Sequence, residues 1–360
     1  MNPTAAVNPW SISADRFPAD GSSEEKLGFV LSYAILAPSS HNTQPWHFRV
    51  HGNVLELHAD VSRALPVVDP DNRELVMSCG AALFHIRVAL QYFGHAYHLE
   101  TFPEPNKPTF LARLVLGLHC ETDTDDIVLF QAIPQRRTNR LAFRPDPVPL
   151  TLLGELQADA QREGAWAQAV LTEEARAAVA DLIAAADRVQ WANRHFRHEL
   201  AAWLRPNKHP GQDGIPGYAE GLTDFKSQVG PVVVRTFDLG KGQAAKDHDI
   251  ALYSPALVVL GTDADTPEDW LRAGQALAHV LLRARSEDVW ASFLNQPIEV
   301  PELRPKLAAA IGRGGFPQIL LRLGYGAEVP PTPRRPLGKV LERPQHGPIH
   351  LDGGSGHVRA

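Results

Sequence analysis

The spacing of apolar positions predicts two long helices and two strands in the first third of the chain. An apolar run at 27–36 follows Ser22-Ser23-Glu24-Glu25, where a serine can cap a helix and acidic residues favour its first turn. Strands are predicted at 54–59, where apolar and polar residues alternate, and at 110–118, which is rich in leucine and valine. A second helix is predicted from the polar segment 69–74 to about Phe93, with one apolar face made by Leu75, Cys79, Leu83, Ile86 and Leu90.

Part of this second helix is repeated later in the chain. The segment Gly80-Ala81-Ala82-Leu83-Phe84-His85-Ile86 aligns with Gly274-Gln275-Ala276-Leu277-Ala278-His279-Val280 and matches it at a glycine, an alanine, a leucine and a histidine. Each copy lies on a predicted helix that is followed by a loop and an apolar strand, at 114–117 and 319–324. Chance likeness of two amphipathic helices is the alternative, but the shared order favours an internal duplication.

These elements suggest a division of the chain into two related halves. Residues 1–22 lack periodicity and are expected to be a flexible lead-in, and the acidic stretch 121–130 is expected to be a linker. The first half would then span 23–120 and the second 131–340, followed by a tail at 341–360. The second half also contains a segment rich in proline and glycine at about 203–221, whose composition suits a lid with stiff pieces and hinge points.

Composition excludes several function classes. The 360 residues carry a net charge of −6 with both signs interspersed, so no basic field is available for a nucleic-acid backbone. Only Cys79 and Cys120 are present, too few for a disulfide framework or a thiolate zinc site. No apolar run approaches the roughly 20 residues that cross a bilayer, and no signal pattern begins the chain. We therefore expect a cytoplasmic protein without nucleic-acid or membrane partners.

The first segment with chemical character is Ala37-Pro38-Ser39-Ser40-His41-Asn42-Thr43-Gln44-Pro45-Trp46-His47-Phe48. Two prolines restrict the backbone on either side of its hydroxyl and amide side chains, which suits recognition of a planar ligand. A second motif is Ile133-Pro134-Gln135-Arg136-Arg137-Thr138-Asn139-Arg140. A helix entering at Pro134 would place Arg136 and Arg140 one turn apart on one face, as an anion site. The alternatives are a core-filling tryptophan at a helix end and a solvated basic helix face.

Together these two motifs resemble those of the nitroreductase superfamily, and the single chain that holds both resembles its Acg-like branch over roughly residues 24–340. The resemblance implies an α+β fold with antiparallel or mixed central sheets flanked by helices, duplicated internally so that one chain mimics the homodimer of the family. It also implies an FMN oxidoreductase that passes a hydride from NAD(P)H through FMN N5 to a nitroaromatic, quinone or other conjugated acceptor. The alternative is a protein that sequesters FMN under a lid that excludes NAD(P)H. The molecule would be a pseudo-dimeric monomer or a weak homodimer.

The same resemblance implies which residues hold FMN, whereas no catalytic side chain and no metal are expected. The first motif would face the flavin ring with Pro38, Ser39, Ser40, Asn42 and Gln44. The second would hold phosphate and ribityl groups with Arg136, Arg137, Thr138 and Arg140. Two further pairs match family positions near flavin N5 and in the C-terminal basic stretch, namely Asn295 with Gln296 and Arg334 with Arg335.

Two weaker patterns are also present. Residues 240–245 read Gly-Lys-Gly-Gln-Ala-Ala after an apolar run at 232–234, a variant of the dinucleotide-binding pattern that would make the protein an NAD dehydrogenase. His195 and His198, with Glu199, have the spacing of metal ligands on a helix, although a solvated helix face explains them as well.

Overall fold

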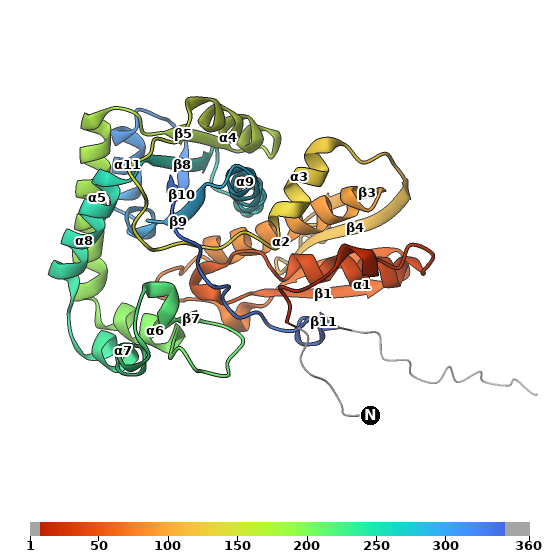
Figure 1. Cartoon of the computed structure of the whole chain (residues 1–360), viewed down its shortest axis with the longest axis horizontal. Helices are drawn as coiled ribbons and strands as arrows, with labels where there is room; N and C mark the ends of the chain where they lie inside the picture. Colours follow the sequence, from red (N-terminus) through yellow and green to blue (C-terminus); the bar gives the residue numbers. More distant parts are fainter. Residues whose placement is uncertain (1–7, 343–360) are drawn as a thin grey trace, which may run out of the picture.

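A computed structural model of the chain describes residues 8–342. The expected lead-in and tail therefore lie partly outside the described residues, at 1–7 and 343–360. The fold is α+β, as the sequence predicts, with two sheets that enclose a pair of long helices (Figure 1).

The first half is built on a five-stranded sheet in the order β11-β1-β2-β4-β3. All neighbours are antiparallel except β11, which pairs in parallel with β1 and comes from the C-terminal end of the described chain. The strands are β1 (Trp46–His51), β2 (Val54–Ala59), β3 (His95–Thr101), β4 (Phe110–His119) and β11 (Leu341–Glu342). Its helices are η1 (Ala14–Arg16), α1 (Ser23–Ala34), η2 (Ser40–Asn42), η3 (Val61–Arg63), α2 (Arg73–Tyr92) and α3 (Thr124–Ala132).

The second half is built on a four-stranded antiparallel sheet in the order β5-β8-β10-β9. Its strands are β5 (Trp166–Ala169), β8 (Ala256–Thr262), β9 (Trp290–Phe293) and β10 (Phe316–Gly324). Helices α4 and α9 cover one face, and α5 with α11 covers the other, so that β8 is buried along its whole length. These helices are α4 (Leu150–Arg162), α5 (Glu173–Ala192), α9 (Pro267–Ser286), α10 (Gln296–Glu299) and α11 (Arg304–Ala310), with η5 (Leu337–Lys339) near the C-terminal strand.

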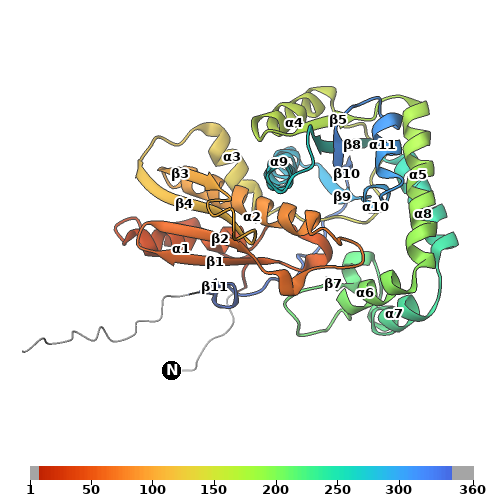
Figure 2. The same ribbon diagram turned by 180° about the vertical axis from the view of Figure 1, so that it is seen from behind.

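The two halves repeat the same order of elements. Strands β1, β2, β4 and β3 correspond to β5, β8, β10 and β9, and the long helices α2 and α9 precede the corresponding strand pairs. These two helices pack against each other between the sheets, as Figure 2 shows from behind.

Their contact is centred on the two glycines of the repeated sequence. A Cβ added to Gly80 would lie 2.3 Å from the carbonyl oxygen of Leu271, and one added to Gly274 would lie 2.0 Å from that of Met77. Met77 stands three positions before Gly80, as Leu271 does before Gly274. The two copies therefore touch through equivalent positions, as in a two-fold interface. The duplication expected from the sequence is confirmed.

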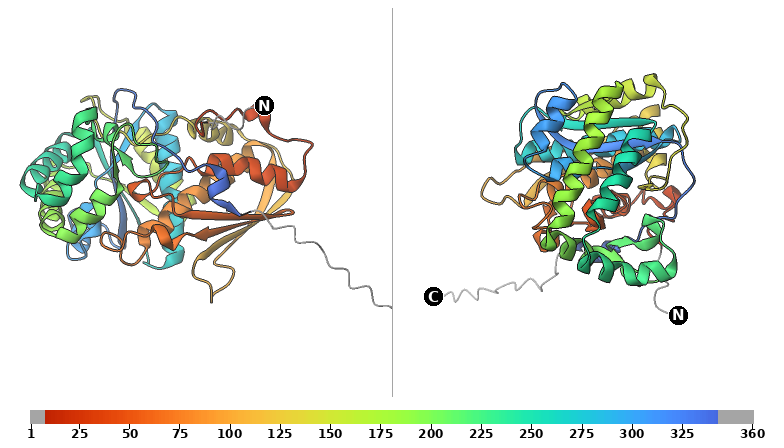
Figure 3. Two further views of the ribbon diagram at one scale, coloured as in Figure 1. Left: turned by 90° about the horizontal axis from the view of Figure 1, so that it is seen from below. Right: turned by 90° about the vertical axis from the view of Figure 1, so that its left-hand side faces the viewer.

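The halves differ by one large insertion. Only two residues, 52–53, connect β1 to β2, whereas residues 170–255 connect the corresponding strands β5 and β8. Besides α5, this insertion contains α6 (Arg194–Trp203), β6 (Leu204–Arg205), β7 (Ile215–Pro216), η4 (Gly217–Glu220), α7 (Asp224–Thr236) and α8 (Gly240–Tyr253). In Figure 3 (right), α5 and α8 run side by side along the end of the molecule.

Several local expectations differ from the structure. The acidic stretch expected to be a linker instead begins α3, because Asp123 and Asp126 form a reciprocal capping box. Residues 134–140 are not helical, so the helix predicted from Pro134 is wrong; Thr138 instead forms a β-bridge with Ala291. Residues 8–22 are packed: the Phe17 ring stacks on Phe93 with a centroid distance of 4.0 Å.

Helix α2 is long and apolar enough to cross a membrane by length and composition alone. Its apolar window is 83% buried within the structure, between the first sheet and α9. This burial is that of a core helix, because every face of it contacts protein.

Candidate functional site

The two halves meet at a central cavity that encloses about 1080 Å³ of space, its open mouth included. The first half contributes the loop at 38–42 and the start of α2, and the second contributes the segment at 136–140, the region of α10 and residues 332–334. Ten of the thirteen predicted site residues line it: Pro38, Ser39, Ser40, Asn42, Arg136, Thr138, Arg140, Asn295, Gln296 and Arg334.

The loop at 38–44 has an unusual backbone. His41, Asn42 and Gln44 adopt φ angles of 51°, 55° and 53°, in the left-handed region that residues other than glycine seldom enter. The fold holds the loop in place through side chains: the Ser39 hydroxyl accepts from the Gln44 amide at 2.9 Å, and the buried Asn42 donates to Pro333 O at 3.1 Å. Such strain persists where surrounding structure fixes it, and often marks a binding site.

The arginine motif reaches the cavity in an extended conformation. Because side chains alternate along an extended backbone, Arg136, Thr138 and Arg140 all face the cavity while Arg137 and Asn139 face away. Arg136 and Arg140 therefore line the same cavity, although the helix expected to place them there is absent. Arg140 pairs with Glu220 of η4 at 3.0 Å.

Two of the cavity arginines are buried without a carboxylate partner. Arg136 is 3% exposed and Arg334 5%, and neither forms an ion pair within residues 8–342. Burial lowers the pKa of Arg136 to about 9, with a contribution from Arg137. Burial and the charge of Arg136 likewise hold the pKa of Arg334 well below its usual range. Uncompensated buried charge is costly, so this pair is suited to an anionic ligand.

Arg334 is held by oxygen atoms of the first half. Its guanidinium donates to Asn42 Oδ1 at 2.9 Å and to the carbonyl oxygens of Leu36 and Ala37 at 3.3 and 3.2 Å. Arg136 also donates to Leu36 O, at 3.2 Å. The Nε atoms of both arginines are buried and have no hydrogen-bond partner among the described residues. Each guanidinium therefore retains donor capacity for a ligand.

Three predicted residues do not line the cavity. The Arg137 guanidinium lies over the Trp10 ring, 3.7 Å from its centroid. Gln44 and Arg335 instead bind each other: Gln44 Oε1 accepts from the Arg335 amide at 2.7 Å, and the Arg335 side chain donates to Gln44 O at 3.0 Å. The sequence motif marks their positions but not the direction of their side chains.

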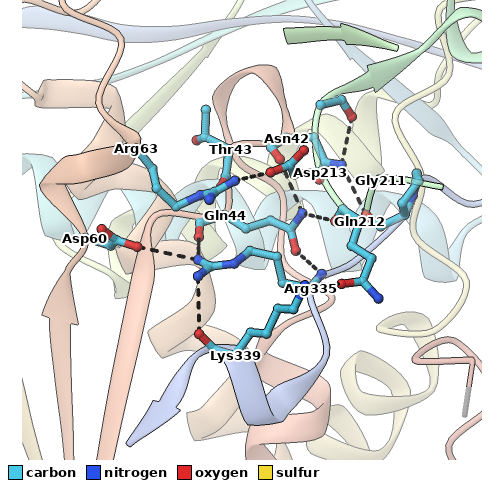
Figure 4. Close-up of polar contacts among 12 residues, drawn as sticks. Asn42, Thr43, Gln44, Asp60, Arg63, Gly211, Gln212, Asp213, Arg335 and Lys339 are labelled. Carbon is cyan, nitrogen blue, oxygen red and sulfur yellow. Dashed lines mark hydrogen bonds and ion pairs between the residues drawn. The ribbon is translucent and has the colours of Figure 1, made fainter. Parts of the chain in front are cut away.

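Gln44 and Arg335 belong to a cluster that anchors the insertion (Figure 4). Gln44 Nε2 donates to Gln212 O at 2.8 Å, and Arg63 pairs with Asp213. Asn42 also donates to Gly214 O at 2.9 Å, and the adjacent Ile215 lines the cavity. The segment 212–215 is thus fastened to the same loop that lines the cavity.

Asn295 and Gln296 begin the short helix α10 at the cavity wall. Asn295 Oδ1 accepts from the Leu320 amide at 3.0 Å, which ties this wall to β10. Gln296 donates to Asp247 Oδ2 at 3.0 Å. Their amide groups are therefore oriented by the second half alone.

The sequence interpretation missed several lining residues. Apolar surface comes from Met77, Ile215, Leu277, Phe293 and Ile319, and polar groups come from His41, Glu74, Ser78, Glu299 and Thr332. Burial lowers the pKa of His41 to about 4, with a contribution from Arg140, so its ring is neutral at neutral pH. Two of these residues had a local signal, because His41 lies between the predicted Ser40 and Asn42, and Glu299 lies three residues after the predicted Gln296.

The weaker sequence patterns take no part in this cavity. Residues 232–234 lie in α7 and 240–245 in α8, so no strand precedes the glycine pattern and the dinucleotide-binding interpretation is wrong. Glu199 accepts from the amides of Val67 and Val68, at 3.0 and 2.9 Å. Across residues 8–342, no group of three or more potential metal ligands is present.

The cavity lining suits a ligand that has both an anionic group and an apolar part. It combines buried guanidinium groups with free donors, apolar side chains such as Met77 and Phe293, and several amide and hydroxyl groups. FMN, which the sequence resemblance implies, has this chemistry.

No model of a protein family matches the chain. Two relatives from Mycobacterium tuberculosis (strain ATCC 25618 / H37Rv) are similar over most of its length, and both are named provisionally as NAD(P)H nitroreductases. The first is 35% identical over 329 residues, which cover 89% of this chain and 92% of the relative. The second, Acg, is 30% identical over 325 residues, which cover 87% and 94%.

Solved structures give a more distant likeness. A crystal structure of the FMN- and NADPH-dependent nitroreductase NfnB from a Sphingopyxis strain is 21% identical, with a TM-score of 0.40 over 59% of this chain and 97% of that chain. The FMN-dependent NfnB from Mycobacterium smegmatis, in complex with NADPH, is 16% identical, with a TM-score of 0.39 over 59% and 96%. TM-scores of this size do not by themselves establish a shared arrangement.

Proposed function

Because the chain belongs to the nitroreductase superfamily, in the branch of the Acg-like proteins, we propose that it is an FMN-dependent oxidoreductase. It would take a hydride from NAD(P)H and pass it to a nitroaromatic, quinone or other conjugated acceptor. We further propose that Pro38, Ser39, Ser40, Asn42, Arg136, Thr138, Arg140, Asn295, Gln296 and Arg334 hold the cofactor.

The observation that carries this proposal is the pair of buried arginines. Arg136 and Arg334 lie in one cavity wall with unpaired Nε atoms and no carboxylate partner in the described part of the chain. A phosphate group would supply the missing negative charge through charge-assisted hydrogen bonds, typically worth about 1.5–3 kcal/mol each. A ligand without an anionic group would leave this charge uncompensated.

Bound FMN supplies the redox chemistry, and the protein binds, orients and shields it. The loop at 38–42 presents hydroxyl and amide groups at fixed positions, because its left-handed backbone is held by Asn42 and Ser39. The apolar side chains of Met77, Leu277 and Phe293 in the cavity lining would reduce its hydration. The arginines keep the anionic end in place.

The test is one absorbance experiment. The purified protein should be yellow, and addition of NADPH without oxygen should bleach the flavin band, which should return on addition of a quinone. A colourless protein that does not bind added FMN would contradict the cofactor assignment. A yellow protein that NADPH does not bleach would contradict the reductase and favour the second candidate function.

That second candidate is sequestration of FMN, and the anchored insertion favours it. Segment 212–215 is bound to Gln44, Asn42 and Arg63 of the first half, and Glu220 pairs with Arg140 at the cavity. If this segment shields the flavin, removal of its side-chain anchors should keep FMN bound and speed its reduction by NADPH. Asp213→Ala removes the partner of Arg63, and Gln212→Ala removes the side-chain oxygen that accepts from Lys339. Lys208→Ala is the matched control, because Lys208 lies in the same insertion but is exposed and pairs with Asp224. Fast reduction of the unaltered protein, unchanged in the double variant, would rule out shielding.

Compartment and assembly remain part of the proposal. The two cysteines are free, which agrees with a reducing cytoplasm. Both walls of the cavity come from one chain, so a monomer should be sufficient for activity, with any homodimer weak. Size-exclusion chromatography would show at which dilution the protein is monomeric. Loss of activity at that dilution would contradict this expectation.

A further inference from the structure

Two glutamates line the central cavity, and the proposed cofactor site uses neither. Glu74 comes from the first turn of α2 and Glu299 from the end of α10, so each half contributes one carboxyl group. Their surroundings differ in the number of groups that stabilise a negative charge. When the environments of two nearby carboxyls differ in this way, one can stay ionised while the other stays protonated.

Glu74 is held by a hydroxyl group and a guanidinium group. Its Oε2 accepts from the Ser40 hydroxyl at 2.5 Å, and its Oε1 accepts from the Arg73 guanidinium at 3.1 Å. Both members of this ion pair are buried. These two charge-assisted contacts fix the position of the Glu74 carboxyl group.

Glu299 lacks such partners. Its Oε2 accepts from the neutral amide of Gln190 at 2.6 Å, and within residues 8–342 it forms no ion pair. Burial raises the pKa of Glu299 well above its usual range, and the charge of Glu74 adds to the shift. Protonated, its hydroxyl can point its hydrogen into the cavity, since no described side chain accepts from Oε1.

We propose that Glu299 is the proton donor to the electron acceptor, and that Glu74 is the positioning charge that keeps Glu299 protonated. The inference rests on the proposed reductase function. It also restricts the acceptor class to compounds whose reduction takes up a proton at an oxygen atom, such as quinones and nitroaromatics.

The step balances for a quinone. The O–H bond of Glu299 would break to give its proton to one quinone oxygen, while bound FMN in its reduced form would supply the two electrons and one hydrogen of a hydride. The products are a hydroquinone, oxidised FMN and the Glu299 carboxylate, which takes a proton from water. NAD(P)H is the reductant that restores the cofactor.

The other charged groups around this pair do not replace Glu299 as donors. Arg73 is already bound to Glu74 and to Gln318, and Asp69 accepts from the amides of Glu74 and Leu75 at the start of α2. On α5, Asp187 faces Gln296 and Asp247. On α11, Arg304 is paired with Asp265. Asp69, Arg73 and Glu74 therefore set the electrostatic field at Glu299, and Glu299 alone of these faces the cavity as an acid.

The experiment uses the FMN-loaded protein, reduced with dithionite and then mixed with an acceptor in a stopped-flow instrument. Benzoquinone needs a proton for each hydride, whereas ferricyanide takes one electron and no proton. General acids contribute about 10²- to 10⁴-fold, so Glu299→Gln should slow reoxidation by benzoquinone at least about 100-fold and leave the ferricyanide rate unchanged. Glu302→Gln, an exposed neighbour, is the matched control and should change neither rate.

A second measurement does not depend on the cofactor. Infrared spectra of the FMN-free protein at neutral pH should show a band of protonated carboxyl groups, and Glu299→Gln should remove part of it. Asp187, whose pKa burial raises to about 7, accounts for another part, so the difference between wild type and variant is the quantity to measure. In Glu74→Gln the Glu299 part of this band should titrate at lower pH, because the like charge that raises the pKa of Glu299 is gone.

Two outcomes would overturn the inference alone: equal slowing with both acceptors, or infrared absorption of protonated carboxyl groups that Glu299→Gln leaves unchanged. A protein that binds no FMN, or is reoxidised by neither acceptor, would overturn the proposed function and this inference together. Equal FMN content in wild type and variants serves as the check on folding.

Discussion

Replacing Arg136 by methionine should weaken binding of FMN and leave the protein without FMN at least as stable as before. Without a bound anion, the charge of Arg136 lowers the stability of the folded protein. The residue is 3% exposed and has no carboxylate partner among residues 8–342, and burial lowers its pKa to about 9. With a phosphate beside it, the same charge becomes favourable. The two states of the protein should therefore respond in opposite directions.

The magnitude follows from one charge-assisted hydrogen bond. Its loss costs about 1.5–3 kcal/mol, which corresponds to a roughly 10- to 150-fold rise in the Kd for FMN. Riboflavin lacks the phosphate, so its Kd should not change. In the protein without FMN, exchange of a buried unpaired charge for an apolar side chain of similar length should be neutral or stabilising. Leu36 O keeps a donor, because Arg334 also reaches it, at 3.3 Å.

The assay titrates FMN-free protein with FMN and with riboflavin, followed by quenching of flavin fluorescence, and records thermal unfolding without ligand. Arg137→Met is the matched control. This residue was also predicted to bind the cofactor, but its guanidinium lies over Trp10, outside the cavity. Arg137→Met should leave the ratio of the Kd for FMN to the Kd for riboflavin near its wild-type value.

Equal weakening of FMN and riboflavin by Arg136→Met would refute the reasoning, because the arginine would then act on the ring or on folding. An effect of Arg137→Met as large as that of Arg136→Met would also refute it. In that case the alternation of side chains along 136–140 would not decide which arginines bind the ligand.

Three other predictions concern the architecture. Released flavin, measured against protein, should give one FMN per chain, since both motif types meet in one cavity; a ratio near two would contradict this. Gly80→Ala should lower the free energy of unfolding by about 1–3 kcal/mol, because the added Cβ would lie 2.3 Å from Leu271 O. Gly154→Ala should raise the free energy of unfolding by about 0.5–1 kcal/mol, because Gly154 lies in a helix with open space around it. Urea titrations measure both changes. Burial and the charge of Asp247 raise the pKa of Asp187 from 3.8 to about 7. Between about pH 4 and 7 the folded state therefore keeps a proton that the unfolded state releases. The free energy of unfolding should fall as the pH rises through this range. Asp187→Asn should reduce this fall, and an unchanged pH profile would contradict the assignment.

Local signals in the sequence predict much of the fold. The strand predicted at 54–59 has those bounds, and Ser22 caps α1 in a reciprocal box with Glu25. These features depend on residues close together in sequence. The repeated glycines also carry long-range information, because only glycine permits the contact between α2 and α9.

The site was predicted less completely, because its details depend on contacts between distant segments. An arginine at 136, a threonine at 138 and an arginine at 140 fit either a helix or an extended chain, and the bridge from Thr138 to Ala291 decides between them. Gln44 and Arg335 turn away from the cavity because residues 212–213 supply partners for this cluster. The role of Glu74 depends on Ser40, which lies 34 positions earlier in the chain. None of these pairings has a signature within a short window of sequence.

The covalent connection of the two halves has a consequence for assembly. A site shared by two separate subunits is complete only while the subunits are associated, so its occupancy depends on protein concentration. Here the contact of Gly80 with Gly274 and the walls of the cavity are made within one chain. The two halves thus face each other at an effective concentration that dilution does not change. The binding site can therefore form in cells that contain very few copies of the protein.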